Sequence, residues 1–145
     1  MQLVSDIIER LSGESVSHAE DVSTNIRHRL TEILNELVSA GSGTTGCMIS
    51  SSDGIAWAQH LQPGFDQHRF AAMSSALLAL SDNLCDETHE GSIKNVVIEG
   101  DKGRVLVMHA GANLLLTVFT THSATLGMSL AHAKRAAEAI ASLRL

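Results

Sequence analysis

Apolar side chains recur at intervals of three and four residues in four stretches of the chain, and this spacing predicts four helices. The first helix is expected over residues 1–12. The second opens with a capping-box pattern at Ser17 and ends before the glycine-rich segment 41–46. The third follows Asp66, and the fourth starts at Ser123 and runs almost to the end of the chain.

Short runs rich in Val, Ile, Leu and Thr predict five β-strands between these helices. The runs are 47–51, 55–59, 93–99, 104–109 and 114–121. The first two are joined by an Asp-Gly pair, which favours a tight hairpin because its backbone tolerates positive φ. The order is helix, hairpin, helix, three-stranded meander, helix. This order predicts an α+β fold with an antiparallel sheet, rather than a parallel sheet with crossover helices. We expect one domain over residues 17–145, preceded by an amphipathic extension over residues 1–16.

The composition narrows the classes of protein to consider. The chain has 145 residues, of which 18% are charged and 3% aromatic, with a net charge of −6. The acidic balance and the lack of aromatic side chains argue against nucleic-acid binding, and the ample aliphatic content argues against disorder. Residues 105–133 carry no Asp, Glu, Lys or Arg, but their polar positions and turns favour buried strands over a membrane span.

The remaining motifs point away from catalysis. The spacing Gly41-x-Gly43-x-x-Gly46 resembles a dinucleotide-binding fingerprint, yet it follows a helix and opens a strand, the reverse of the required context. Cys47 and Cys85 have no metal-type spacing and suggest reduced thiols in a cytoplasmic protein. We therefore expect no catalytic residue, no cofactor and no targeting signal.

The eight histidines leave one alternative open. None lies three or four residues from another, so no helix face presents a pair of metal ligands. His60, His109 and His122 lie at predicted strand ends and could converge in space. Their scattered positions nevertheless favour structural or surface roles, and we expect no metal site.

The third predicted helix is uncharged over most of its length. Its small side chains allow a second backbone to approach closely: Ala71, Ala72, Ser75, Ala76 and Ala79. Its larger apolar side chains form the main stripe: Phe70, Met73, Leu77, Leu80 and Leu84. Because a helix that is apolar all round is buried all round, and a chain this small offers little to cover both sides, the pattern predicts a homodimer.

At this point the order of motifs resembles a known family. The segments that carry the resemblance are the hairpin at 46–54, Ala71-Ala72, the runs 96–99, 103–107 and 114–118, Leu126-Gly127 and the Ala-rich C-terminal helix. Over about residues 24–143 the chain resembles the Roadblock/dynein-light-chain superfamily, in particular its bacterial regulators of Ras-like GTPases.

The resemblance implies a five-stranded antiparallel sheet flanked by helices in the order α-ββ-α-βββ-α, similar to profilin-like folds. It also implies a homodimer that joins sheets through the third strand, with the second helices of the domain packed together. In this sequence the joining strand is expected over 94–99, which places Lys94, Val96 and Ile98 in the interface beside the small helix residues.

For function, the resemblance implies a non-enzymatic homodimer that binds a Ras-like small GTPase and modulates its GTP hydrolysis without inserting an arginine. Two alternatives stay open. One is a light-chain-like scaffold that is indifferent to the nucleotide, and the other is a small-molecule sensor of the profilin-like type. The sequence identifies neither the GTPase nor the direction of regulation.

Overall fold

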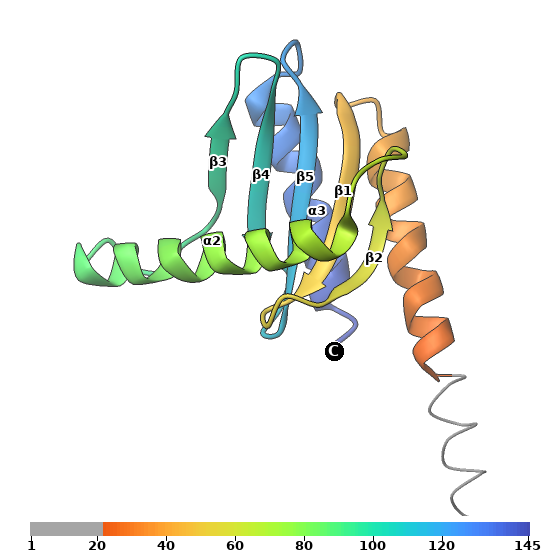
Figure 1. Cartoon of the computed structure of the whole chain (residues 1–145), viewed down its shortest axis with the longest axis horizontal. Helices are drawn as coiled ribbons and strands as arrows, with labels where there is room; N and C mark the ends of the chain where they lie inside the picture. The colour runs from red at the N-terminus through yellow and green to blue at the C-terminus, as the bar shows by residue number, and fades with distance from the viewer. Residues whose placement is uncertain (1–21) are drawn as a thin grey trace, which may run out of the picture.

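Five antiparallel strands form one sheet, with helices on both of its faces (Figure 1). The computed structural model describes residues 22–145, so the helix expected over 1–12, the extension 1–16 and the helix start at Ser17 lie outside the described residues. The first helix is described over 22–39. The other elements are β1 (Thr44–Ser51), β2 (Ala56–His60), α2 (Gln67–Glu87), β3 (Val96–Glu99), β4 (Gly103–His109), β5 (Leu114–Thr121) and α3 (Leu126–Ala141).

The strands lie in the order β2-β1-β5-β4-β3. The β1-β2 hairpin and the β3-β4-β5 meander are joined in the middle of the sheet by antiparallel pairing of β1 with β5, in which Met48 lies opposite Thr117. This arrangement leaves β2 and β3 as edge strands. The predicted fold class, an α+β five-stranded antiparallel sheet flanked by helices, is confirmed.

Alternation along each strand divides the interior into two unequal cores. On β5, Leu116 and Val118 face the first helix and α3, where they belong to a cluster of seventeen buried residues. Leu115 faces α2, and the buried cluster on that side contains only Leu78, Val107 and Leu115. Figure 1 shows α2 crossing one face of the sheet and α3 lying against the other.

Two local predictions are confirmed in detail. Gly54, in the β1-β2 hairpin, has φ of +86°, and a Cβ added there would lie 3.3 Å from the Cα of Ala72 on α2. Glycine is therefore required both for the turn and for the close approach of α2. Asp66 caps α2, since its carboxylate accepts hydrogen bonds from the backbone N–H groups of His68 and Arg69 at 3.1 and 3.3 Å.

Several boundaries differ from the predicted ones. Strand β1 begins at Thr44, three residues before the predicted run 47–51, and β2 covers Ala56–His60 rather than 55–59. Strand β3 begins at Val96, so Lys94 precedes the strand, because residues 88–95 return the chain from the end of α2 to the sheet edge. Helix α3 begins at Leu126, after the backbone of Ala124 bonds back to Thr121 in a turn that leaves β5. Within residues 22–145 no helix combines the length and hydropathy that a membrane span requires.

Candidate interaction surface

Helix α2 runs across the strands and ends beyond the sheet. Its 21 residues correspond to about 32 Å of helix. Its main contacts with the sheet are to β1, β2 and β4, and Leu78 also packs with Leu115 of β5. Figure 1 shows the C-terminal part of α2 extending past the edge formed by β3. This overhang leaves the distal turns of the helix without a sheet beneath them.

The face of α2 that packs on the sheet combines small side chains with leucines, since Leu77 packs partly against the same cluster as Leu78. Its buried residues are Ala71, Ser74 and Leu78. Met73, Leu80 and Leu84, which the periodicity placed in the main stripe, are 55%, 69% and 64% exposed. The hairpin turn approaches the helix closely at Ala72, since a Cβ added to Gly54 would lie 3.3 Å from its Cα, so a short side chain suits that position.

The five small residues predicted as a helix contact therefore divide between two faces. Ala71 is fully buried against its own sheet, which leaves its side chain no surface for a second chain. Ser75 is half-buried and its hydroxyl donates a hydrogen bond to the carbonyl oxygen of Ser52. Ala72, Ala76 and Ala79 are exposed on the opposite side.

The exposed residues define what we call the outer face of α2: Ala72, Met73, Ala76, Ala79, Leu80 and Leu84. No charged residue occurs between Arg69 and Asp82. The small side chains form one ridge along the helix and the large ones form a ridge beside it, an arrangement that suits helix-on-helix packing. A sequence pattern cannot assign the large residues to this side, because their spacing is equally that of a core stripe.

Strand β3 provides a second uncovered surface, next to the overhang of α2. Among residues 22–145 it pairs only with β4, so its other edge is open in this part of the chain. Val96 belongs to the cluster beneath α2, and Ile98, two residues along on the same face, is 43% exposed. Lys94 is exposed and lies outside the strand. Of the three residues predicted for the joining strand, two are therefore in β3.

The charged end of β3 is neutralised within the chain. The Arg104 guanidinium donates to the Glu99 carboxylate. This hydrogen bond, together with the nearby positive charge, lowers the pKa of Glu99. Arg104 also donates to the carbonyl oxygen of Ala124 at 2.7 Å, which ties it to the turn before α3. The edge of β3 thus presents mainly apolar side chains and backbone groups.

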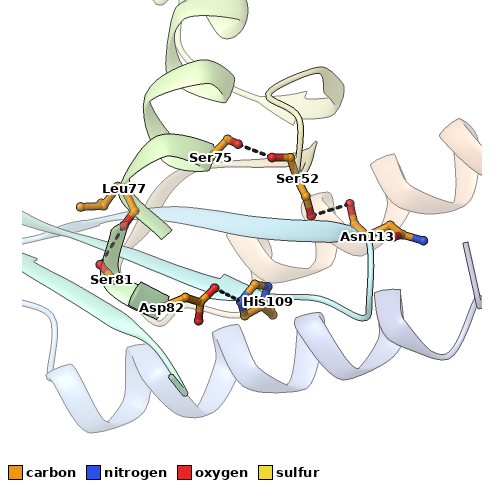
Figure 2. A network of polar contacts seen from close by, with 7 residues as sticks. All are labelled: Ser52, Ser75, Leu77, Ser81, Asp82, His109 and Asn113. Carbon is orange, nitrogen blue, oxygen red and sulfur yellow. Dashed lines mark hydrogen bonds and ion pairs between the residues drawn. The ribbon is translucent and has the colours of Figure 1, made fainter. Parts of the chain in front are cut away.

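Polar contacts hold α2 at two places along its inner face (Figure 2). At the first, Ser75 bonds to Ser52, whose own backbone N–H and hydroxyl donate to the carbonyl oxygen of Asn113 at 3.0 and 3.2 Å. At the second, a carboxylate oxygen of Asp82 lies 3.0 Å from Nε2 of His109 at the end of β4. These contacts join segments far apart in the sequence, so no local sequence pattern predicts them.

Other chemistry is sparse in the described residues. Within 22–145 no group of three or more His, Cys, Asp and Glu side chains is arranged to hold a metal, so the histidines at strand ends do not gather there. Cys47 is fully buried beside the Leu34 carbonyl oxygen, and burial raises its thiol pKa to about 12, which disfavours the nucleophilic thiolate.

Three of the chain's four aromatic rings meet at one corner, which the sequence did not suggest. The centroid of Phe70 lies 5.4 Å from that of Phe65 and 5.7 Å from that of Phe119. A hollow of about 270 Å³ adjoins Phe65 and Phe119, with Gly46 and Leu61 also in its lining. It lies near the N-terminal end of α2, away from the overhang.

Comparison with known proteins places this geometry in a family. A family model described as the Roadblock/LC7 domain matches residues 30–120. The uncharacterized proteins MJ1340 and MJ0310 of Methanocaldococcus jannaschii are 32% and 31% identical to the chain over 101 residues. Each alignment covers 70% of this chain and 88% of the relative.

Solved structures share the fold at lower identity. A structure described as MglB with tetrameric arrangement has a TM-score of 0.73 and 24% identity, covering 81% of this chain and 89% of that one. The gliding protein MglB of Thermus thermophilus has a TM-score of 0.72 and 23% identity, covering 81% and 90%. Profilin IB of Acanthamoeba castellanii, at 11% identity and a TM-score of 0.60, covers 79% and 98%.

Proposed function

The chain belongs to the Roadblock/LC7 family, and on that premise we propose that it is a homodimeric, non-enzymatic regulator. Its partner is a Ras-like small GTPase in the cytoplasm, whose GTP hydrolysis it modulates. The family premise supports the class of partner, and the surface of this chain supports the dimer. The regulator acts by arranging the GTPase's own residues, so it supplies no catalytic group.

One observation carries the dimer: α2 is uncharged from Phe70 to Ser81 with an exposed apolar outer face, and the helix extends past the open edge of β3. If two copies pair their β3 strands about a twofold axis, the two sheets become one and each overhang reaches over the neighbouring subunit. The ridge of Ala72, Ala76 and Ala79 then lets the two α2 helices approach closely. Ile98, exposed in the single chain, is covered at the same seam.

Burial of these side chains favours association because exposed apolar surface of this extent is uncommon on a monomer. Leu80 and Leu84 are each more than half exposed in the single chain. A second copy supplies the missing cover. In such a dimer the two α2 helices lie on the same side of the joined sheet.

The dimer is tested by placing a charge on the small ridge. We expect Ala72→Arg and Ala76→Arg each to lower the mass measured by light scattering to that of a monomer, or to cause aggregation. Ala112→Arg, at an exposed position in the β4-β5 turn, is the matched control and should leave the mass unchanged. A soluble, unaltered dimer in both ridge variants would show that another face joins the subunits.

The GTPase proposal is tested with a Ras-like GTPase from the same organism, loaded with GDP or with a GTP analogue. Complex formation is measured by calorimetry, and GTP hydrolysis by phosphate release. We expect binding that depends on the nucleotide and a changed rate of hydrolysis. Absence of binding in every nucleotide state rejects the proposal.

Two other outcomes would identify the alternatives. Binding to a protein subunit irrespective of nucleotide would indicate a light-chain-like scaffold. A ligand that copurifies in native mass spectrometry would indicate a sensor, and the hollow beside Phe65 and Phe119 is the place to look for it.

A further inference from the structure

The contact between α2 and its sheet is small for a helix of this length. Only Ala71, Ser74 and Leu78 are buried among its 21 residues, and Leu78 alone has a large apolar side chain. The cluster beneath α2 has three buried members, against seventeen on the other face of the sheet. Since local stability follows buried apolar contact, the core under α2 is held less firmly than the core that the first helix and α3 cover together.

Two hydroxyl groups without partners lie in this contact. Ser50 and Thr117 are 0% and 1% exposed, and neither hydroxyl has a hydrogen-bond partner among the described residues. Both belong to the α2 face, because Ser50 pairs with Leu115 and Thr117 is two residues further along β5. Burying an unpaired hydroxyl is unfavourable, so the docked position of α2 carries a cost that access of water would remove.

The two polar contacts described above offset this cost, and we call them the Ser75 clamp (Ser75 with Ser52) and the Asp82 clamp (Asp82 with His109). They lie seven residues apart on α2, about two turns, and Figure 2 shows both on the side that faces the sheet. The side chains of Asp82 and His109 are 38% and 41% exposed, so water competes for that clamp.

We propose that α2 is a conformational switch with a docked position, held by the two clamps, and an undocked position in which water reaches Ser50 and Thr117. A partner that covers the outer face of α2 stabilises the docked position, because it adds buried surface only when the helix is in place. Identifying that partner as a second copy or a GTPase rests on the proposed function, whereas the weak docking does not.

Hydrogen exchange of the full chain, followed by mass spectrometry, tests the docking. We expect backbone amides in the middle of α2 to exchange at least about tenfold faster than those in the middle of α3. Combining Ser50→Ala with Thr117→Val removes both unpaired hydroxyls and should slow exchange in α2 by about tenfold or more. Thr120→Val is the matched control, since its hydroxyl is also buried and unpaired among the described residues but faces the other core.

The clamps are tested by their removal. Ser75→Ala and Asp82→Ala should each speed exchange in α2 by about fivefold while leaving the first helix and α3 unchanged. Asp86→Ala, which alters an exposed carboxylate on the same helix, should change nothing. Exchange in α2 as slow as in α3, and insensitive to both sets of variants, would overturn the proposal.

A dilution series separates this inference from the proposed dimer. If the dimer forms, protection of α2 should fall as the protein is diluted below its dissociation constant, while protection of α3 stays constant. If light scattering finds a monomer at every concentration, the dimer is rejected. The effects of the hydroxyl and clamp variants then still decide whether α2 is weakly docked.

Discussion

Leu115 and Leu116 are neighbours on β5 whose side chains enter opposite faces of the sheet, so replacing each by alanine compares the two cores directly. Leu116 is fully buried between the sheet and the two helices on the larger side. Leu115 is 1% exposed but is covered by α2 alone, in contact with the small cluster of Leu78 and Val107. The two sites thus match in residue type and burial and differ only in what surrounds them.

The expected losses in the free energy of unfolding depend on how far the neighbouring side chains can move into the space that each substitution leaves. Replacing a buried leucine by alanine costs about 2–5 kcal/mol, with larger values where the cavity persists. The cluster around Leu116 is anchored by two helices, so we expect a loss of about 4 kcal/mol. Around Leu115 the helix α2 can move toward the sheet or admit water, so we expect about 2 kcal/mol.

Urea unfolding followed by circular dichroism, at one protein concentration for all variants, measures both losses from the midpoints and slopes. The wild-type chain and the two variants should show the same native spectrum, so that the losses refer to the same fold. A loss at Leu115 equal to or greater than that at Leu116 would refute the idea that the core beneath α2 is the weaker one.

Three further predictions concern single sites. Burial raises the pKa of the Cys47 thiol from 9.0 to about 12, so as the pH rises the unfolded chain loses the thiol proton before the folded chain does. The free energy of unfolding should therefore be constant below pH 9 and should fall by up to about 1.4 kcal/mol per pH unit between pH 9 and pH 12. Cys47→Ala should remove that slope in urea titrations, and an unchanged slope would contradict the assignment. Asp66→Ala removes the cap of α2 and should lower stability by about 1 kcal/mol, whereas Asp66→Asn should largely preserve it. Gly103→Ala forces a Cβ against the Thr120 carbonyl oxygen and should cost about 1–3 kcal/mol, so an unaltered melting temperature would show that β4 shifts freely.

Much of the candidate surface follows from composition, but its orientation does not. The uncharged character of α2 and the presence of a small-residue ridge are visible in the sequence, and Ala72, Ala76 and Ala79 are indeed exposed. Ala71 lies in the same segment yet is buried, because it faces the sheet. The clamp between Asp82 and His109 joins residues 27 positions apart, so the helix and strand periods of the sequence could not predict this contact.

By itself, the sequence determined the elements, since helix and strand periods, the Asp66 cap and the Gly54 turn depend on interactions between residues close in the chain. Tertiary structure alone decided two further features: the pairing of β1 with β5 and the side of α2 that turns inward, whereas the open edge at β3 was already implied by the family resemblance. The physical reason is that these features depend on contacts between residues far apart in the chain, which helix and strand periods do not encode: on α2, Ala71, Ser74 and Leu78 turn inward, whereas Met73, Leu80 and Leu84 stay exposed.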